Sequence, residues 1–78
     1  MNEDNLIGMA NQIGDFFASL PGHDEALEGI ADHIRRFWEP RMRRALLATL
    51  DLPEHAAALS GPVREALLKY RAELTPAA

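Results

Sequence analysis

Three histidines, His23, His33 and His55, carry the side chains of this 78-residue sequence that most readily bind a metal or transfer a proton. Two ligands on one helical face require an i, i+4 spacing, whereas these histidines stand 10 and 22 residues apart. Neither Ser19 nor Ser60 lies in a nucleophile-elbow motif, and the chain has no cysteine. Its glycines fit neither dinucleotide-binding nor P-loop spacing. We therefore predict a protein that is not an enzyme and that binds no metal or cofactor itself.

The basic residues are concentrated in one short stretch. Residues 1–32 contain seven Asp or Glu and no Lys or Arg, whereas residues 33–44 contain five arginines and one Glu, within a net charge of −4. The stretch also holds two aromatic residues and a proline. Aromatic residues and Arg are enriched at the centres of protein interfaces, and Arg pairs with carboxylates in bidentate geometry. A protein-docking surface is predicted here, and the arginines are Arg35, Arg36, Arg41, Arg43 and Arg44.

Two other roles for this stretch remain open. The arginines can pair with the acidic residues of their own chain, with Phe37 and Trp38 in the core. Alternatively, they can bind the phosphates of a nucleic acid while the aromatic rings stack on bases. The acidic residues 1–32 would repel such a polyanion unless they face away from it, and Arg41, Arg43 and Arg44 form no single stripe in helical projection. A nucleic-acid-binding helical module is therefore the weaker alternative.

The spacing of apolar residues predicts an all-α fold. Residues recur with helical periodicity over 3–20, 24–38, 40–50 and 61–74, and turn residues separate these segments. Residues 54–59 are expected to form one loose turn, and no segment has the alternation of a strand. We predict a bundle of three to four helices in a single domain over residues 1–78. The apolar stripe expected for the first helix is Leu6, Met9, Ala10, Ile13, Phe16, Phe17 and Leu20.

A second face of the first helix carries mostly small residues. Asn11, Gly14 and Ala18 follow Ile7 at helical spacing. Glycine inside a helix costs about 1 kcal/mol relative to alanine, and close approach by another backbone would offset that cost. We therefore predict that Asn11, Gly14 and Ala18 form a close-packing face.

The length and hydropathy of the chain bear on its stability and on its cellular location. A chain of this size buries only about 60% of its unfolded surface, so a partner surface would add to a marginal stability. The sequence begins with acidic rather than basic residues, unlike a signal peptide, and it contains no apolar run of membrane-spanning length. We expect a cytoplasmic protein that does not enter a membrane.

Two segments resemble a known family. Residues 9–17 read M-A-N-Q-I-G-D-F-F and residues 30–43 read I-A-D-H-I-R-R-F-W-E-P-R-M-R. Both look like signatures of the delta subunit family of NAD-dependent formate dehydrogenases that contain molybdenum or tungsten. The resemblance covers about residues 5–50, and the second segment is the more specific because it joins several uncommon residues in a fixed order.

The resemblance implies a noncatalytic accessory subunit that docks on the alpha, catalytic subunit and supports assembly or stability. It further implies that the complex, with its beta and gamma subunits, carries a bis-pterin guanine dinucleotide metal centre, iron–sulfur clusters, FMN and NAD. An alternative role is transient maturation, in which the five arginines hold the phosphates of the pterin cofactor during its insertion. No catalytic residue carries over. The predicted partner interface consists of Asn11, Gly14, Ala18, Arg36, Phe37, Trp38, Pro40, Arg41 and Arg43.

Overall fold

The computed structural model describes residues 2–77 and confirms the all-α prediction, since these residues form helices and no strand. Four of the helices have nine or more residues and correspond to the four predicted segments. Two further helices and one 3-10 turn are shorter. In chain order the elements are α1 (Glu3–Ala18), α2 (His23–Phe37), α3 (Pro40–Ala48), η1 (Thr49–Asp51), α4 (Pro53–Ala58), α5 (Gly61–Lys69) and α6 (Arg71–Leu74).

The helix ends differ from the predicted ones for local reasons. α1 ends at Ala18, and the Ser19 hydroxyl donates a hydrogen bond to the Phe16 carbonyl at 2.7 Å. The helix expected over 61–74 is interrupted at Tyr70, where the backbone turns to φ −108° and ψ 21°. The loose turn expected near residue 54 is instead the complete helix α4, which begins at Pro53 because proline fits the first turn of a helix.

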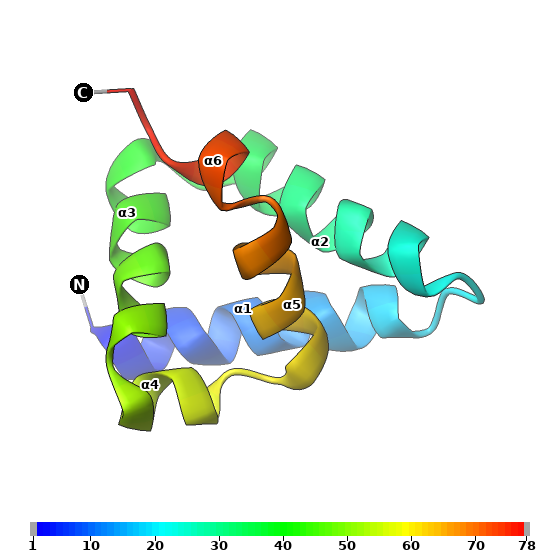
Figure 1. Ribbon diagram of the computed structural model, residues 1–78, viewed down its shortest axis with the longest axis horizontal. Coiled ribbons are helices and arrows are strands. Elements are labelled where there is room, and N and C mark those ends of the chain that lie inside the picture. Colours follow the sequence, from blue (N-terminus) through cyan, green and yellow to red (C-terminus); the bar gives the residue numbers. More distant parts are fainter. Residues whose placement is uncertain (1, 78) are drawn as a thin grey trace.

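α1 and α2 form a helical pair that the rest of the chain covers on one side. Figure 1 shows them meeting at the turn that joins them and diverging toward their other ends, where α3 runs across the opening. α5 lies over the space between them and packs on both helices. The chain thus builds a second layer over one face of the α1–α2 pair.

One apolar cluster joins the helices α1, α2, α3, α5 and α6. Its centre consists of side chains from α2, α3 and α5 that are shielded from solvent, including Ile30, Leu46 and Val63. The buried face of α1 differs from the predicted stripe, because Ile7 is buried and Phe16 is exposed. The complete cluster is Leu6, Ile7, Ala10, Leu27, Ile30, Ala31, Ile34, Trp38, Leu46, Leu47, Leu59, Val63, Ala66, Leu67 and Leu74.

The face of small residues on α1 is where the linker to α5 packs. The Asn11 amide nitrogen donates to the Ala58 carbonyl at 3.0 Å, and its oxygen accepts from the Ser60 N–H at 2.8 Å. Gly14 is buried below α5, since a Cβ built there would lie 2.5 Å from Cγ2 of Val63. The close approach predicted for Asn11 and Gly14 therefore occurs within the chain itself.

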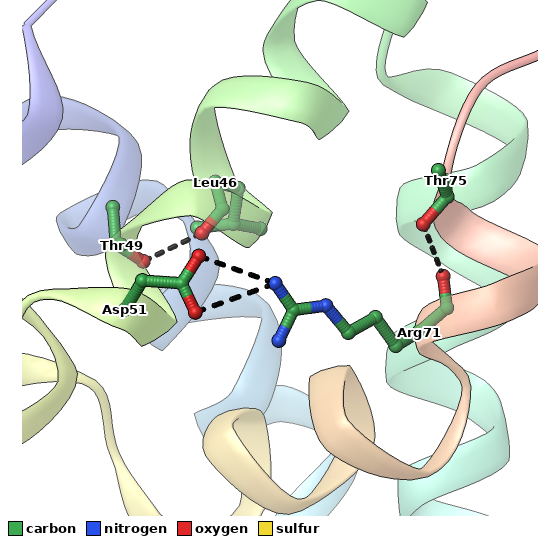
Figure 2. A network of polar contacts seen from close by, with 5 residues as sticks. All are labelled: Leu46, Thr49, Asp51, Arg71 and Thr75. Atoms are coloured by element: carbon green, nitrogen blue, oxygen red, sulfur yellow. Dashed lines mark hydrogen bonds and ion pairs between the residues drawn. The ribbon is translucent and has the colours of Figure 1, made fainter.

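Polar contacts fasten the C-terminal segment to the rest of the bundle. Figure 2 shows Arg71 of α6 reaching Asp51 of η1, with Nη2 lying 3.3 Å from Oδ2. The buried Thr49 hydroxyl donates to the Leu46 carbonyl at 2.6 Å, and the Thr75 hydroxyl donates to the Arg71 carbonyl at 2.7 Å. These contacts join the end of α3 to the last helical turn, 20 residues later in the chain.

The two helical glycines of α1 provide a matched test of this packing. We expect Gly14→Ala to lower the free energy of unfolding by about 1–3 kcal/mol, because the new methyl group collides with the fully buried Val63. Gly8→Ala should raise it by about 1 kcal/mol, because Gly8 faces open space and alanine is the better helix former. Urea denaturation followed by far-UV circular dichroism measures both. Equal effects of the two substitutions would contradict this packing.

Candidate functional site

A row of four rings, exposed at its two ends and half-buried between them, crosses the α1–α2 pair. Phe16 contacts Phe17 edge-to-face with ring centroids 5.1 Å apart, and Phe17 lies 6.2 Å from the His33 ring. His33 continues the row to Phe37 at 4.9 Å. Phe16 and Phe37, the two ends of this aromatic row, are 70% and 73% exposed to solvent. Aromatic side chains are normally buried to a large extent, so the row is the most conspicuous apolar feature of the surface.

A shallow groove follows the α1 side of the row. Its volume is about 450 Å³, and most of the surface that lines it is apolar. Met9, which is 44% exposed, lies in this groove one helical turn before Ile13. The remaining lining residues are Gln12, Phe16, Phe17 and His33. The groove therefore offers apolar contacts along α1 and a single imidazole from α2.

Helix geometry explains why the row is uncovered. At 100° per residue, Phe16 points away from Gly14 and hence from the α5 layer. On α2, Gly29, His33 and Phe37 are spaced by four residues and share one face. Gly29 leaves room for the Phe17 ring, because a Cβ at that position would overlap the ring edge. The absence of a side chain at Gly29 thus lets Phe17 lie between the two helices and continue the row.

Two arginines at the end of α2 share one carboxylate. Arg36 Nε lies 2.9 Å from Asp32 Oδ2, and Arg35 Nη2 lies 2.9 Å from Oδ1. The hydrogen bond from Arg36, joined by that from Arg35, lowers the pKa of the Asp32 carboxyl below its ordinary value. Both guanidinium groups remain about half exposed or more, so the charged ends of Arg35 and Arg36 stay accessible to solvent although they share Asp32.

The arginines of α3 are arranged differently. Arg41 and Arg44 are exposed and three residues apart, so they share one side of the helix, whereas Arg43 is half-buried. Within residues 2–77, none of these three side chains forms an ion pair. The groove beside Arg35 is lined by the carboxylates of Glu28, Asp32 and Glu73, which would repel a phosphate.

Residues 2–77 contain neither a candidate metal site nor a helix that could span a membrane. Among residues 2–77, no three His, Asp or Glu side chains come close enough together to hold a metal ion. His23 instead contacts Glu65, with Nε2 lying 2.9 Å from Oε2. In the same range, no helix has the length and apolar character that crossing a bilayer requires.

Comparison with known families identifies the chain. The sequence model of the NADH-dependent formate dehydrogenase delta subunit family, FdsD, matches residues 5–67. The chain belongs to this family. The matched region includes the aromatic row, the arginine cluster and the linker to α5. Comparisons with curated proteins and with solved structures gave no match.

Family membership confirms the resemblance found in the sequence, and the structure sorts the predicted interface residues by accessibility. Arg36, Phe37, Pro40 and Arg41 are exposed around the junction of α2 and α3, where a partner can reach them. Ala18 is also exposed, at the end of α1. Contact of these five residues with a partner stays a prediction.

The other predicted interface residues are buried or are engaged within the chain itself. Trp38 is only 6% exposed and belongs to the core, so it is not a docking anchor in this conformation. Gly14 and Asn11 are engaged by α5 and its linker, and Arg43 has its Nε buried without a hydrogen-bond partner in the described residues. These side chains serve the interior of the bundle, which leaves Phe37 as the accessible aromatic residue of the junction.

Sequence reasoning also missed part of the site. Met9 and Phe16 were expected in the core because they lie on the apolar stripe of α1, and His33 was given no role in docking. The available signal was the width of the apolar surface of α1, which has a stripe and a face of small residues. The rest of the bundle buries Leu6 and Ala10 of the stripe together with Ile7 and Gly14, and it leaves Met9 and Phe16 exposed.

The neighbours Phe37 and Trp38 should respond differently to substitution. We expect Trp38→Ala to lower the free energy of unfolding by about 3–5 kcal/mol, because it opens a cavity in the core. Phe37→Ala should change it by no more than about 0.5 kcal/mol, because most of that ring is in water. Chemical denaturation monitored by circular dichroism checks both values. A large effect of Phe37→Ala would contradict the exposed position of this ring.

The Asp32 cluster should make stability depend on pH. Because the pKa of this carboxyl is lower in the folded chain, its contribution is present above the unfolded-state value of about 3.9. That contribution is lost as the pH falls through the folded-state pKa. The urea midpoint of Asp32→Asn should therefore lie below that of the wild type at neutral pH and approach it in strong acid.

Asp15→Asn is the control for this pH dependence. It removes a carboxylate from the last turn of α1, where negative charge is unfavourable to the helix dipole, so it should not lower the midpoint at neutral pH. Equal loss of stability in both variants would mean that general charge, not the Asp32 cluster, governs the response.

Proposed function

We propose that this chain is a noncatalytic accessory subunit that docks on the alpha subunit of formate dehydrogenase and supports assembly or stability of the complex. The observation that carries the proposal is the uncovered aromatic row, whose two end rings are more than two-thirds exposed. A contiguous apolar surface of this kind is typical of a site that another protein covers. Membership of the delta subunit family supplies the complex in which such a partner would be found.

The chemistry of the chain supports a binding role over a catalytic one. Among residues 2–77, no three His, Asp or Glu side chains form a group that could hold a metal ion, and the carboxylates of the groove beside Arg35 line it together with that arginine. By contrast, three of the exposed large apolar side chains, Met9, Phe16 and Phe37, lie on α1 and α2. In this proposal the partner subunits carry the cofactors and the redox chemistry, and this chain contributes a surface that binds the alpha subunit.

Expression of the complex with and without this chain tests the proposal. With a tag on the alpha subunit, we expect the chain to co-purify in equimolar amount from fully active enzyme. Enzyme made without it should be recovered in lower yield, or should lose formate-dependent NAD reduction faster on incubation, because an apolar surface is left open. Subunit stoichiometry, activity half-life and metal content are the measurements.

The same preparation separates the structural role from transient maturation. Active enzyme that lacks the chain, together with metal-free enzyme when the chain is omitted, would replace the structural proposal by a maturation role. The arrangement of the arginines favours the structural role, because Arg35 and Arg36 bind Asp32 whereas Arg41 and Arg44 lie on α3. They do not converge on one phosphate-sized pocket. A nucleic-acid partner is disfavoured by the same arrangement.

A further inference from the structure

The geometry points to the aromatic row and the adjoining arginines as a groove for one amphipathic helix of a partner subunit. This inference rests on the proposed docking function and specifies the surface and the chemistry of its occupant. The apolar stripe of that helix would lie along the row from Phe16 to Phe37. Its acidic side chains would lie toward the junction of α2 and α3, where Phe37 precedes the exposed Arg41 and Arg44 in the chain. The argument combines the spacing of the rings with the distribution of charge.

The spacing of the rings matches the repeat of a helix. Successive centroids of the row are 5.1, 6.2 and 4.9 Å apart. One turn of an α-helix rises about 5.4 Å, which is close to these distances, so apolar side chains one turn apart on a bound helix can contact neighbouring rings. The groove of about 450 Å³ beside the row, lined by Met9 and Ile13, provides a place for those apolar side chains.

The two ends of the row differ in charge. Phe16 lies in the segment 1–32, which contains no Lys or Arg, and its neighbour Asp15 forms no ion pair within the described residues. Phe37 lies in residues 35–44, which contain five Arg and one acidic residue, Glu39. Opposite charges at the two ends fix one orientation of a bound helix and favour an occupant that is acidic near Phe37.

A partner subunit fits this surface better than a second copy of the chain. Each copy carries a net charge of −4, so two copies repel each other at long range. The arginines without ion pairs in the described residues, Arg41 and Arg44, favour an acidic surface from elsewhere. The family of the chain supplies that surface, because a delta subunit works among other subunits.

Two double variants with matched apolar content test the groove. Phe16→Ser/Phe37→Ser removes both exposed ends of the row, and Leu52→Ser/Leu68→Ser removes two residues outside the row that are 52% and 57% exposed. In co-expressed complex captured through the alpha subunit, we expect at least tenfold less of the first variant than of wild type. The control variant should be retained at the wild-type level. Circular dichroism of each isolated variant verifies that it is folded.

Charge reversal tests the acidic end of the occupant. Arg41→Glu should reduce retention severalfold, and the salt sensitivity of capture should weaken, because an attraction becomes a repulsion. Lys69→Glu reverses a half-exposed base on α5 and should leave retention unchanged.

Crosslinking identifies the occupant directly. A photoreactive phenylalanine derivative at position 37 should crosslink to an amphipathic helical peptide of a partner subunit that contains Asp or Glu.

The outcomes separate this inference from the proposed function. Failure of the wild-type chain to co-purify would overturn both. Retention of the wild type together with full retention of the Phe16/Phe37 variant would overturn the groove alone. A crosslink to a second copy of the chain, with dimers in sedimentation analysis that the row variant abolishes, would assign the row to self-association and overturn the partner helix.

Discussion

The contact between α1 and α5 at Gly14 determines which surfaces of this protein are buried. Val63 occupies the space that a Cβ at Gly14 would need, so α5 lies directly against the backbone of α1. The side of α1 that faces α5 is therefore buried, and the opposite side of α1 is not covered by α5. Because the chain has a single covering layer, the approach of α5 at Gly14 leaves the aromatic side chain of Phe16 without a cover.

The uncovered surface follows from the small size of the chain. Short domains have little interior, and a helix with an apolar surface wider than its buried arc exposes the remainder. α1 has such a surface, and Phe37 of α2 extends it. The polar contacts of Asn11 and Arg71 hold the covering layer in position, so the row is presented on a defined scaffold rather than on a mobile loop.

The junction of α2 and α3 shows how backbone geometry separates neighbouring side chains. Phe37 is the last helical residue, whereas Trp38 has extended backbone angles of φ −95° and ψ 129°. Glu39 is extended as well, as expected for a residue before proline, and Pro40 begins α3. This break turns Trp38 into the core and leaves Phe37 in solvent. Both residues have the same apolar, aromatic character in the sequence, so their composition predicts the same environment for both.

The sequence by itself determined the all-α fold, the approximate extent of the four long helices and the family, because periodicity, turn residues and motifs are local properties. It also located the exposed junction residues Arg36, Phe37 and Arg41. Only the tertiary structure decided that Trp38 is buried, that Asn11 and Gly14 serve the interior, and that Phe16 joins His33 in a surface row. The burial of Trp38 depends on the backbone break between α2 and α3, whereas the other outcomes depend on where α5 packs, which is set by contacts between residues far apart in the chain.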